Sequence, residues 1–349
     1  MPIVSNPNES ITIEHPLKSQ IKKSKSNGIY HIEIGTVCIL KNTWILEFFN
    51  HLESLIDATL ARRLAHASLS HTMNLDYSKW LPKKSFFPFQ KDKKIIDAFE
   101  RWAENRIYLG RGIVTPVNWP YSFHIEKPLM VSIEVGEICS FMQSLLGYSL
   151  RYQWRDDGGS NASVTFEQID VPISEIENYQ FEQEHDLEYI FDIDNGMNWP
   201  SRDGMQISII STNVLHEFAK TINELNLKEL DDPIIQINNL SGLIENILCM
   251  ASINACSVDN QRYLLDSTEQ FENWFENHIN SNGLGKLTSC NYDDYDLSIT
   301  FEPFIPWPII SGIILDAWQR SNGILGKIEV HSLSENNIEI SIKSRRQIA

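Results

Sequence analysis

The sequence predicts an α+β protein built from two pseudo-symmetric repeats, each with helices packed on a small antiparallel sheet. Three observations support this prediction. A nine-residue motif occurs twice, several glycines recur at one fixed spacing, and both halves show the same order of helix-forming and strand-forming stretches. With 349 residues, the chain is also long enough for two domains.

The repeated motif comprises residues 99–107 and 271–279, which read FERWAENRI and FENWFENHI. Six of the nine positions are identical, which is far more than average residue usage would give by chance. Further matches downstream share a single offset of 176 residues, and a constant offset is typical of a duplicated fold. These matches pair Glu126 with Glu302, Ile133 with Ile309, Gly136 with Gly312, and Gly147 with Gly323.

The same series of elements is expected in each half. Apolar residues at helical spacing predict the helices, glycines end them, and alternating apolar residues around a turn predict a hairpin. In the first half these are a strand at 29–40, helices at 46–69 and 99–107, a strand at 122–126, a helix at 133–146, and hairpin strands at 149–155 and 162–167. In the second half they are a strand at 205–210, helices at 240–255 and 271–279, a strand at 297–302, a helix at 309–319, and hairpin strands at 326–332 and 337–343.

Charge divides the chain further. The first residues are polar and hold four lysines, which predicts a mobile basic tail. Between residues 167 and 194 there are ten acidic residues and no Lys or Arg, which predicts a solvated, extended linker. The expected organisation is a tail at 1–27, a first domain at 28–168, an acidic linker at 169–204 and a second domain at 205–345.

A helix ending in Gly-x-Gly, a strand, an apolar helix bounded by glycine and a final β-hairpin resemble the 4-vinyl reductase (V4R) domain family. The resemblance covers residues 110–167 and 283–343. It implies domains of the TRAPP-like fold that hold an apolar small molecule between helices and sheet, and two tandem copies would form an internal pseudo-dimer. Many members carry a metal-associated cysteine cluster in the final hairpin. Residues 149–167 and 325–343 contain no cysteine, so neither a metal site nor the reductase activity is carried over, and the cofactor stays unknown.

An aromatic insertion, at about residues 73–90, distinguishes the first half from the second. It places five aromatic residues among three lysines. Three interpretations are open: a lid over an apolar ligand, a contact surface for a protein partner, or an extension packed on its own domain. For Trp102 of the repeated motif, core packing, packing between the two copies and a place in a ligand site are the open interpretations. The candidate ligand- or partner-binding residues are Tyr77, Trp80, Phe86, Phe87, Phe89 and Trp102.

Composition excludes several classes of function. The net charge of −17 would repel nucleic acid and anionic membranes, so no nucleic-acid partner is expected. The longest apolar stretch, residues 304–315, contains two prolines and is shorter than the roughly 20 residues of a transmembrane helix. Five scattered cysteines do not form a disulfide framework, which favours a cytoplasmic location.

The sequence contains no zinc-protease, nucleophile-elbow or Walker motif, and it nominates neither catalytic residues nor a metal site. The favoured interpretation is a non-enzymatic intracellular scaffold for interaction or assembly, with a protein partner. The alternative is a sensor or carrier of an apolar aromatic or tetrapyrrole-like small molecule. A scaffold predicts a filled core and an exposed apolar patch, whereas a sensor predicts a cavity lined by aromatic residues. An enzyme would need convergent polar groups with shifted pKa values.

Overall fold

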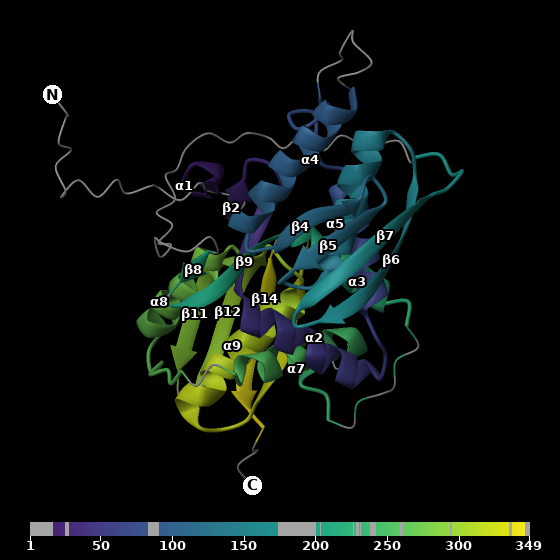
Figure 1. Ribbon diagram of the computed structural model, residues 1–349. Helices are drawn as coiled ribbons and strands as arrows, with labels where there is room; N and C mark the ends of the chain where they lie inside the picture. Colours follow the sequence, from purple (N-terminus) through teal and green to yellow (C-terminus); the bar gives the residue numbers. More distant parts are fainter. Residues whose placement is uncertain are drawn as a thin grey trace, which may run out of the picture.

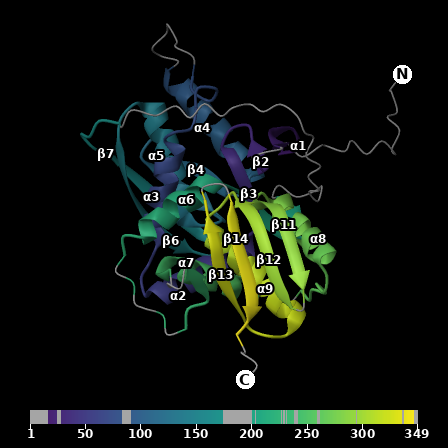
Figure 2. The same ribbon diagram turned by 180° about the vertical axis from the view of Figure 1, so that it is seen from behind.

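The computed structural model has an α+β fold, as the sequence predicts (Figure 1). Helices pack on three sheets that are built mainly from antiparallel strand pairs, and Figure 2 shows the same arrangement from behind. The structure describes residues 17–24, 28–82, 91–173, 200–202, 204–225, 227, 230, 232–237, 242–258, 261–293, 295–334 and 337–345.

One sheet comes entirely from the first half of the chain, and with its helices we call it the first unit. Its four strands are antiparallel and follow the order β4-β5-β7-β6. Helix α5 packs against α3, and Phe99 of α4 joins Phe123 and Phe141 in a common aromatic core. The elements are α3 (Ala61–Thr72), α4 (Lys91–Tyr108), β4 (Ile113–Asn118), β5 (Ser122–Glu126), α5 (Val131–Leu146), β6 (Leu150–Gly158) and β7 (Asn161–Gln168).

A second sheet comes from the second half, and with its helices we call it the second unit. Its order is β10-β13-β14-β12-β11, with β10 parallel to β13 and every other pair antiparallel. Helix α7 packs against α9, and α8 packs beside β11. The elements are β10 (Ile235–Ile237), α7 (Leu243–Cys256), α8 (Thr268–His278), η2 (Asn280–Asn282), β11 (Gly285–Asp293), β12 (Asp296–Pro303), α9 (Trp307–Asn322), β13 (Gly326–Leu333) and β14 (Ile338–Ser344).

The third sheet joins the two halves and has the order β1-β2-β3-β9-β8. Its centre is the antiparallel pair β3·β9, in which Ile39 lies opposite Ile209. We call it the central sheet. Its strands, with the helices that follow or precede them, are α1 (Leu17–Gln20), β1 (Ile21–Ser24), β2 (Gly28–His31), β3 (Gly35–Lys41), α2 (Asn42–Ile56), β8 (Ser201–Arg202), β9 (Met205–Ser211) and α6 (Thr212–Ile222).

Helices α2 and α6 each pack on the unit formed by the other half of the chain. Helix α2 follows β3 but contacts α7, whereas α6 follows β9 but contacts α3. Phe49 of α2 and Phe218 of α6 meet edge to face, with their ring centroids 5.1 Å apart. The two predicted domains therefore share both a sheet and a hydrophobic core.

The N-terminal segment differs in part from the expected mobile tail. Leu17 and Ile21 are fully or almost fully buried, and β1 pairs with β2, so residues 17–24 extend the central sheet. Burial of these two apolar side chains explains why the segment is ordered. The four lysines alone had predicted a mobile tail. Residues 1–16 and 25–27 lie outside the described part of the chain, as do residues 174–199 of the predicted acidic linker.

The predicted helix at 46–69 is two helices. Helix α2 ends at Ile56, and Asp57 adopts a left-handed conformation with φ of 56°. The Glu53 carboxylate then accepts a hydrogen bond from the backbone N–H of Leu60, at 2.6 Å, just before α3 begins. The break lets α2 and α3 pack against different partners, which a continuous apolar periodicity does not reveal. Within the residues that the structure describes, no helix combines the length and the hydropathy of a membrane span.

Candidate functional site

Tyr77 and Trp102, two of the residues proposed from the sequence, lie in the core of the first unit. The Trp102 ring stacks on Phe141 with a centroid distance of 4.3 Å and an interplanar angle of 2°. The Tyr77 ring meets the same phenylalanine edge on at 5.2 Å, and its hydroxyl lies 3.5 Å from Ser140 Oγ. Tyr77 also lines a hollow of about 300 Å³ beside Leu81. Both rings therefore stabilise the unit by packing.

Trp80 is half-buried against the same core, with Lys79 Nζ 4.9 Å from the centroid of its ring. Lys79 also forms an ion pair with Glu33 of the central sheet. Phe86, Phe87 and Phe89 lie outside the described residues, so the aromatic insertion is placed only up to residue 82. The structure thus brings Tyr77 and Trp102 together around Phe141, with Trp80 at the rim of that core.

Four charged side chains that the sequence reasoning passed over are buried between α4, α5 and β9. Arg106 pairs with both Glu134 and Glu137, and Arg111 pairs with the same two carboxylates at 2.8 and 3.0 Å. Arg111 also lies 3.5 Å from the carbonyl oxygen of Ile209 in the central sheet. We call these four residues the ion quartet. It ties the first unit to the strand that the second half contributes.

The charges of the ion quartet are balanced, two against two, which allows them to be buried. Burial by itself would raise the pKa of Glu137, but the positive charges of Arg106 and Arg111 outweigh it and the pKa is lowered. In the same way, the two carboxylates outweigh burial and raise the pKa of Arg106. The Arg106 guanidinium also lies over the Trp102 ring, 4.8 Å from its centroid. Arg106 and Glu137 therefore stay charged at neutral pH.

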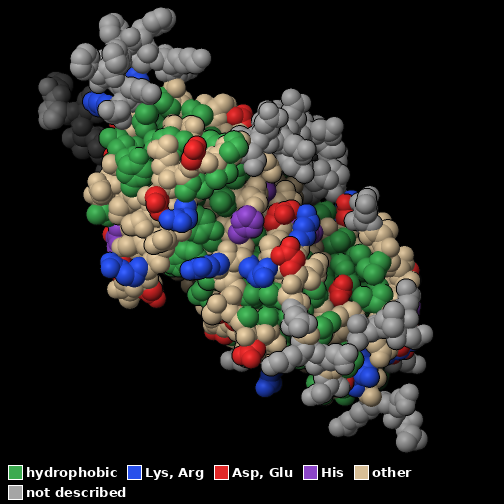
Figure 3. Space-filling model, turned by 90° about the vertical axis from the view of Figure 1, so that its right-hand side faces the viewer, with side chains coloured by type: hydrophobic (Ala, Val, Ile, Leu, Met, Phe, Trp, Pro, Cys, Tyr) green, Lys and Arg blue, Asp and Glu red, His purple; other side chains and the backbone are tan. Residues whose placement is uncertain are grey.

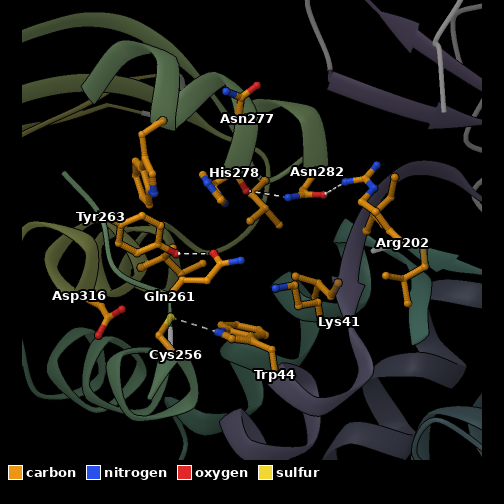
Figure 4. A pocket seen from close by; sticks show the side chains of 16 residues that line it. Lys41, Trp44, Arg202, Cys256, Gln261, Tyr263, Asn277, His278, Asn282 and Asp316 are labelled. Carbon is orange, nitrogen blue, oxygen red and sulfur yellow. Dashed lines mark hydrogen bonds between the residues drawn. The ribbon is translucent and has the colours of Figure 1, made fainter. Parts of the chain in front are cut away.

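A cleft of about 200 Å³ lies where the central sheet meets the second unit (Figure 4). Figure 4 shows the labelled side chains around an open centre, with Tyr263 on one side, Lys41 and Arg202 on the other, and His278 and Trp44 between them. The lining residues come from both halves of the chain: Ile39, Leu40, Lys41, Trp44, Arg202, Ile207, Cys256, Gln261, Tyr263, Trp274, Asn277, His278, Asn282, Leu284, Ile313 and Asp316.

One wall of the cleft is aromatic. The Trp274 and His278 rings of α8 stack at 5.4 Å, and Tyr263 meets Trp274 edge to face at 5.9 Å. Trp44 stands across from them, held by a hydrogen bond from its indole Nε1 to Cys256 Sγ at 3.3 Å. Flat rings that are fixed by such contacts offer a preformed surface to a flat ligand.

The opposite side of the cleft carries donors and positive charge. Arg202 donates a hydrogen bond to Asn282 Oδ1 at 2.7 Å, and Asn282 in turn donates to the carbonyl oxygen of His278 at 2.8 Å. Lys41 ends β3 and lines the cleft beside them. The acidic residue of the lining, Asp316, is paired with Arg320 at 2.7 Å. Among the described lining residues, Lys41 and Arg202 thus stand against the single carboxylate of Asp316.

Trp274 has an unmet hydrogen-bonding capacity. Its side chain lines the cleft and is only 5% exposed, and its indole Nε1 has no hydrogen-bond partner among the described residues. An indole N–H can only donate, and a buried donor without an acceptor is costly. An acceptor atom that reached this shielded N–H would supply that partner.

Metal chemistry receives no support from the residues that the structure describes: they contain no group of three or more His, Cys, Asp or Glu side chains arranged to hold an ion. Cys38, Cys139 and Cys249 are buried, and burial raises the pKa of the Cys38 and Cys139 thiols to about 12. These thiols therefore stay protonated and inert at neutral pH.

The sequence held weak signals for the sites that were missed. Glu134 and Glu137 interrupt an otherwise apolar helix, which is a pattern typical of buried, paired charges. Trp274 and His278 were visible as part of the repeated motif, but their partners Tyr263 and Trp44 come from distant segments. Comparison of the chain with family models, with curated proteins and with solved structures finds no match.

Proposed function

We infer that the two units are copies of one ancestral module. Leaving β10 aside, both sheets place their strands in the same chain order, with the last strand of each half between its second and third. The helix pairs match as well: Ser68 of α3 donates to the carbonyl oxygen of Ile133 at 2.9 Å, and Ser252 of α7 donates to that of Ile309 at 2.8 Å. Gly136 and Gly312 follow these two isoleucines at the same distance along the chain.

The central sheet supports an arrangement of the two copies around a pseudo-two-fold axis. The β3·β9 ladder is antiparallel and pairs Val37 with Ser211 and Lys41 with Ile207 on either side of the Ile39–Ile209 pair. The glycine at the end of each repeated-motif helix packs on the other half's strand: a Cβ on Gly110 would collide with the Ile207 carbonyl, and one on Gly283 with the Val37 carbonyl. Reciprocal contacts of this kind are typical of isologous dimers. The resemblance to 4-vinyl reductase domains, as a tandem pseudo-dimer, is part of this proposal.

We propose that the protein binds a small aromatic molecule with an acceptor or anionic group in the cleft beside the central sheet. The proposal is carried by a cleft with aromatic and basic walls and by its lining residue Trp274, whose buried indole N–H has no hydrogen-bond partner among the described residues. A cavity of about 150 Å³ takes a benzene ring, so about 200 Å³ suits a molecule of one or two rings. The carboxylate of such a ligand would meet Lys41 and Arg202. The proposal includes no chemical step on the ligand.

The test combines two measurements. Native mass spectrometry of the freshly purified protein looks for a bound small molecule, and calorimetry follows titration with one- and two-ring aromatic carboxylates and the corresponding amines. We expect the carboxylates to bind more tightly than the amines. We expect Kd to rise at least ten-fold in Trp274→Phe, which keeps a ring but loses the donor, and in Lys41→Ala.

Trp102→Phe is the matched control, because Trp102 occupies the same place in the repeated motif and is also 5% exposed. It should leave Kd unchanged. Ile313→Phe, which narrows the cleft from α9, should abolish binding. The proposal fails if the protein carries no small molecule and no carboxylate binds more tightly than its amine.

A scaffold function is the second proposal, and a different feature favours it. The exposed large apolar residues of the described chain include Val117 on β4, and Leu264 and Leu325 outside the helices and strands. The outer edge of β6 in the first unit pairs with no other described strand and offers an attachment site for a partner protein.

A further inference from the structure

The two units differ at one edge of their sheets. In the second unit, β13 is covered by β10, which runs parallel to it. In the first unit, the strand at the same place is β6, and it pairs only with β7 among the strands that the structure describes. An edge strand with free backbone N–H and C=O groups is a template for pairing with another chain.

The matching of the two edges extends to individual residues. Tyr152 and Ile328 each follow the helix-ending glycine of their unit, Gly147 or Gly323, by the same number of residues. Ile328 receives β10: it lies opposite Ile235, and its N–H donates to the Ile234 carbonyl at 2.9 Å. In the first unit, an open groove runs along the corresponding stretch. Its lining residues are Arg62, Arg151, Tyr152, Gln153 and Trp154.

The helix beside each edge carries a residue placed to hold an added strand. Asn246 of α7 anchors β10, because its amide oxygen accepts from the N–H groups of Ile234 and Ile235 and its amide nitrogen donates to the Ile235 carbonyl at 2.9 Å. Arg62 is the counterpart of Asn246, since each lies six residues before the matched serine of its helix, Ser68 or Ser252. Arg62 is exposed and lines the groove. It forms no hydrogen bond or ion pair with any described residue.

The connection between α2 and α3 is too short to supply a strand of its own. Residues 223–242 separate α6 from α7 and include β10, whereas only residues 57–60 separate α2 from α3. The first unit therefore lacks, at this place in the chain, the segment that covers the edge in the second unit. Tyr152 and Trp154 are left half-buried at the positions of the isoleucine and valine that β10 covers.

We propose that the β6 edge is a strand-addition site for an extended, acidic segment of a partner protein, which would pair in parallel as β10 does. Charge argues for an acidic segment, because Arg62 lines the groove without an ion-pair partner among the described residues, whereas the other arginine of the lining, Arg151, is paired with Glu167 of β7. Figure 3 shows several basic side chains across this side of the molecule, with acidic side chains between them. A carboxylate beside the second or third residue of the added strand would meet the Arg62 guanidinium in a charge-assisted hydrogen bond.

A second copy of this chain fits the edge less well. Antiparallel pairing of two β6 strands would place Arg151 and Arg62 of one copy near the same residues of the other. Like charges opposite each other in a sheet are destabilising. A partner with the opposite charge has no such cost, and it would find a basic site on a protein whose net charge is −17.

The test uses the full-length protein and a fluorescent peptide with the sequence of residues 231–238, DDPIIQIN, which contains the strand that covers the matched edge. We expect one peptide to bind per chain. The Kd should rise at least ten-fold in Arg62→Ala and at least ten-fold when both aspartates of the peptide are replaced by asparagine. A peptide that is N-methylated at alternate residues cannot complete the ladder and should not bind. Arg101→Ala, an exposed arginine on α4, is the control and should leave Kd unchanged.

Three results would overturn the proposal. They are the absence of peptide binding, binding that is equal in Arg62→Ala and the original protein, and binding that survives N-methylation. Sedimentation gives a further check: a dimer of the protein that the peptide dissociates would assign the edge to a second copy instead. Because the cleft lies on the other unit, none of these results bears on the proposed aromatic ligand.

Discussion

The two units have sheets of the same strand order, β10 aside, but enclose different interiors. The first unit buries the ion quartet where α4, α5 and the central sheet meet. At the matched positions the second unit has His278, Leu284, Ile310 and Ile313, and three of these line the cleft. Phe141 fills the space beside Trp102, whereas its counterpart Ala317 leaves Trp274 without a stacked ring on that side. Two units with the same strand order, β10 aside, thus have one filled, ionic centre and one open, aromatic cleft.

This difference predicts that one unit provides rigidity and the other binds the ligand. A buried network of balanced charges holds one geometry, because each group that moves loses its partner in a medium that solvates it poorly. The apolar and aromatic residues of the second unit have no such constraint and leave room for a ligand. The first unit is then expected to be the rigid half of the molecule, and the following predictions test that difference in order of expected effect.

The largest effect is expected from breaking the ion quartet. Glu134→Ala should lower the free energy of unfolding by about 3–5 kcal/mol, because it leaves two buried guanidinium groups with one carboxylate. Denaturant titration measures the loss. The control Glu100→Ala, on the exposed face of α4, should change stability by less than about 0.5 kcal/mol.

Replacement of the whole quartet sharpens the same test. The fourfold variant Arg106→His, Arg111→Leu, Glu134→Ile and Glu137→Ile gives the first unit the residues of the second. Since no unpaired charge is left, it should be more stable than Glu134→Ala alone. A cost of less than about 1 kcal/mol for the single change would show that the quartet does not hold the first unit together.

A pH effect of roughly 3 kcal/mol is expected from His71. This side chain is 7% exposed, and burial lowers its pKa to about 4, although Glu137 and Glu217 act in the opposite direction. Its folded-state pKa lies below the ordinary value, so the neutral form is favoured by folding. The contribution of neutral His71 to the free energy of unfolding should therefore be fully present above about pH 6.5 and be lost as the pH falls from there towards 4.

The counterpart of His71 in the second unit is Ala255. His71→Ala should therefore flatten the stability profile between pH 6.5 and 4, even though the truncation itself costs stability at every pH. His31 is also buried, with a pKa lowered to about 3, and should account for part of the slope that is left. An unchanged slope in His71→Ala would show that other groups set the acid sensitivity.

The smallest of these effects should be equal in the two units. A Cβ on Gly136 would collide with the Ala65 carbonyl, and one on Gly312 with the Cys249 carbonyl, so both helix pairs depend on a close backbone approach. Gly136→Ala and Gly312→Ala should each cost about 1–3 kcal/mol in thermal or denaturant unfolding. Ser144→Ala, near the C-terminal end of α5, is the control. If only one glycine tolerated alanine, the two helix pairs would not be equivalent.

Local features were predictable to a large degree. The strand expected at 122–126 is β5 with the same bounds, and the helix expected at 133–146 is α5 with two more residues at its start. Gly147 ends that helix in a left-handed conformation with φ of 81°, as its position in the sequence indicated. Such features depend on neighbouring residues only, so periodicity and glycine placement are enough to find them.

The candidate site was predicted less well. Tyr77 was a candidate as part of the aromatic insertion and Trp102 as part of the repeated motif, but both pack in the core. The cleft depends on Lys41, Arg202 and Tyr263, which are far apart in the chain and carry no motif. An aromatic residue in a core and one in a cleft have the same sequence signature, because only the neighbours that fold against it decide which it is.

The sequence by itself determined the order of the elements, the repeated motif and the glycines that end the helices, because each follows from short-range sterics and apolar spacing. Only the tertiary structure decided that β3 pairs with β9, that α2 packs on the second unit and that α6 packs on the first unit. It also decided that the first unit encloses charged side chains, whereas the second unit borders a cleft. The strand pairing and the helix packing rest on contacts between residues more than a hundred positions apart, and the ion pairs of the first unit on contacts 23 to 31 positions apart. Their free energy depends on the shape and charge of both partners at once, and no local pattern records it.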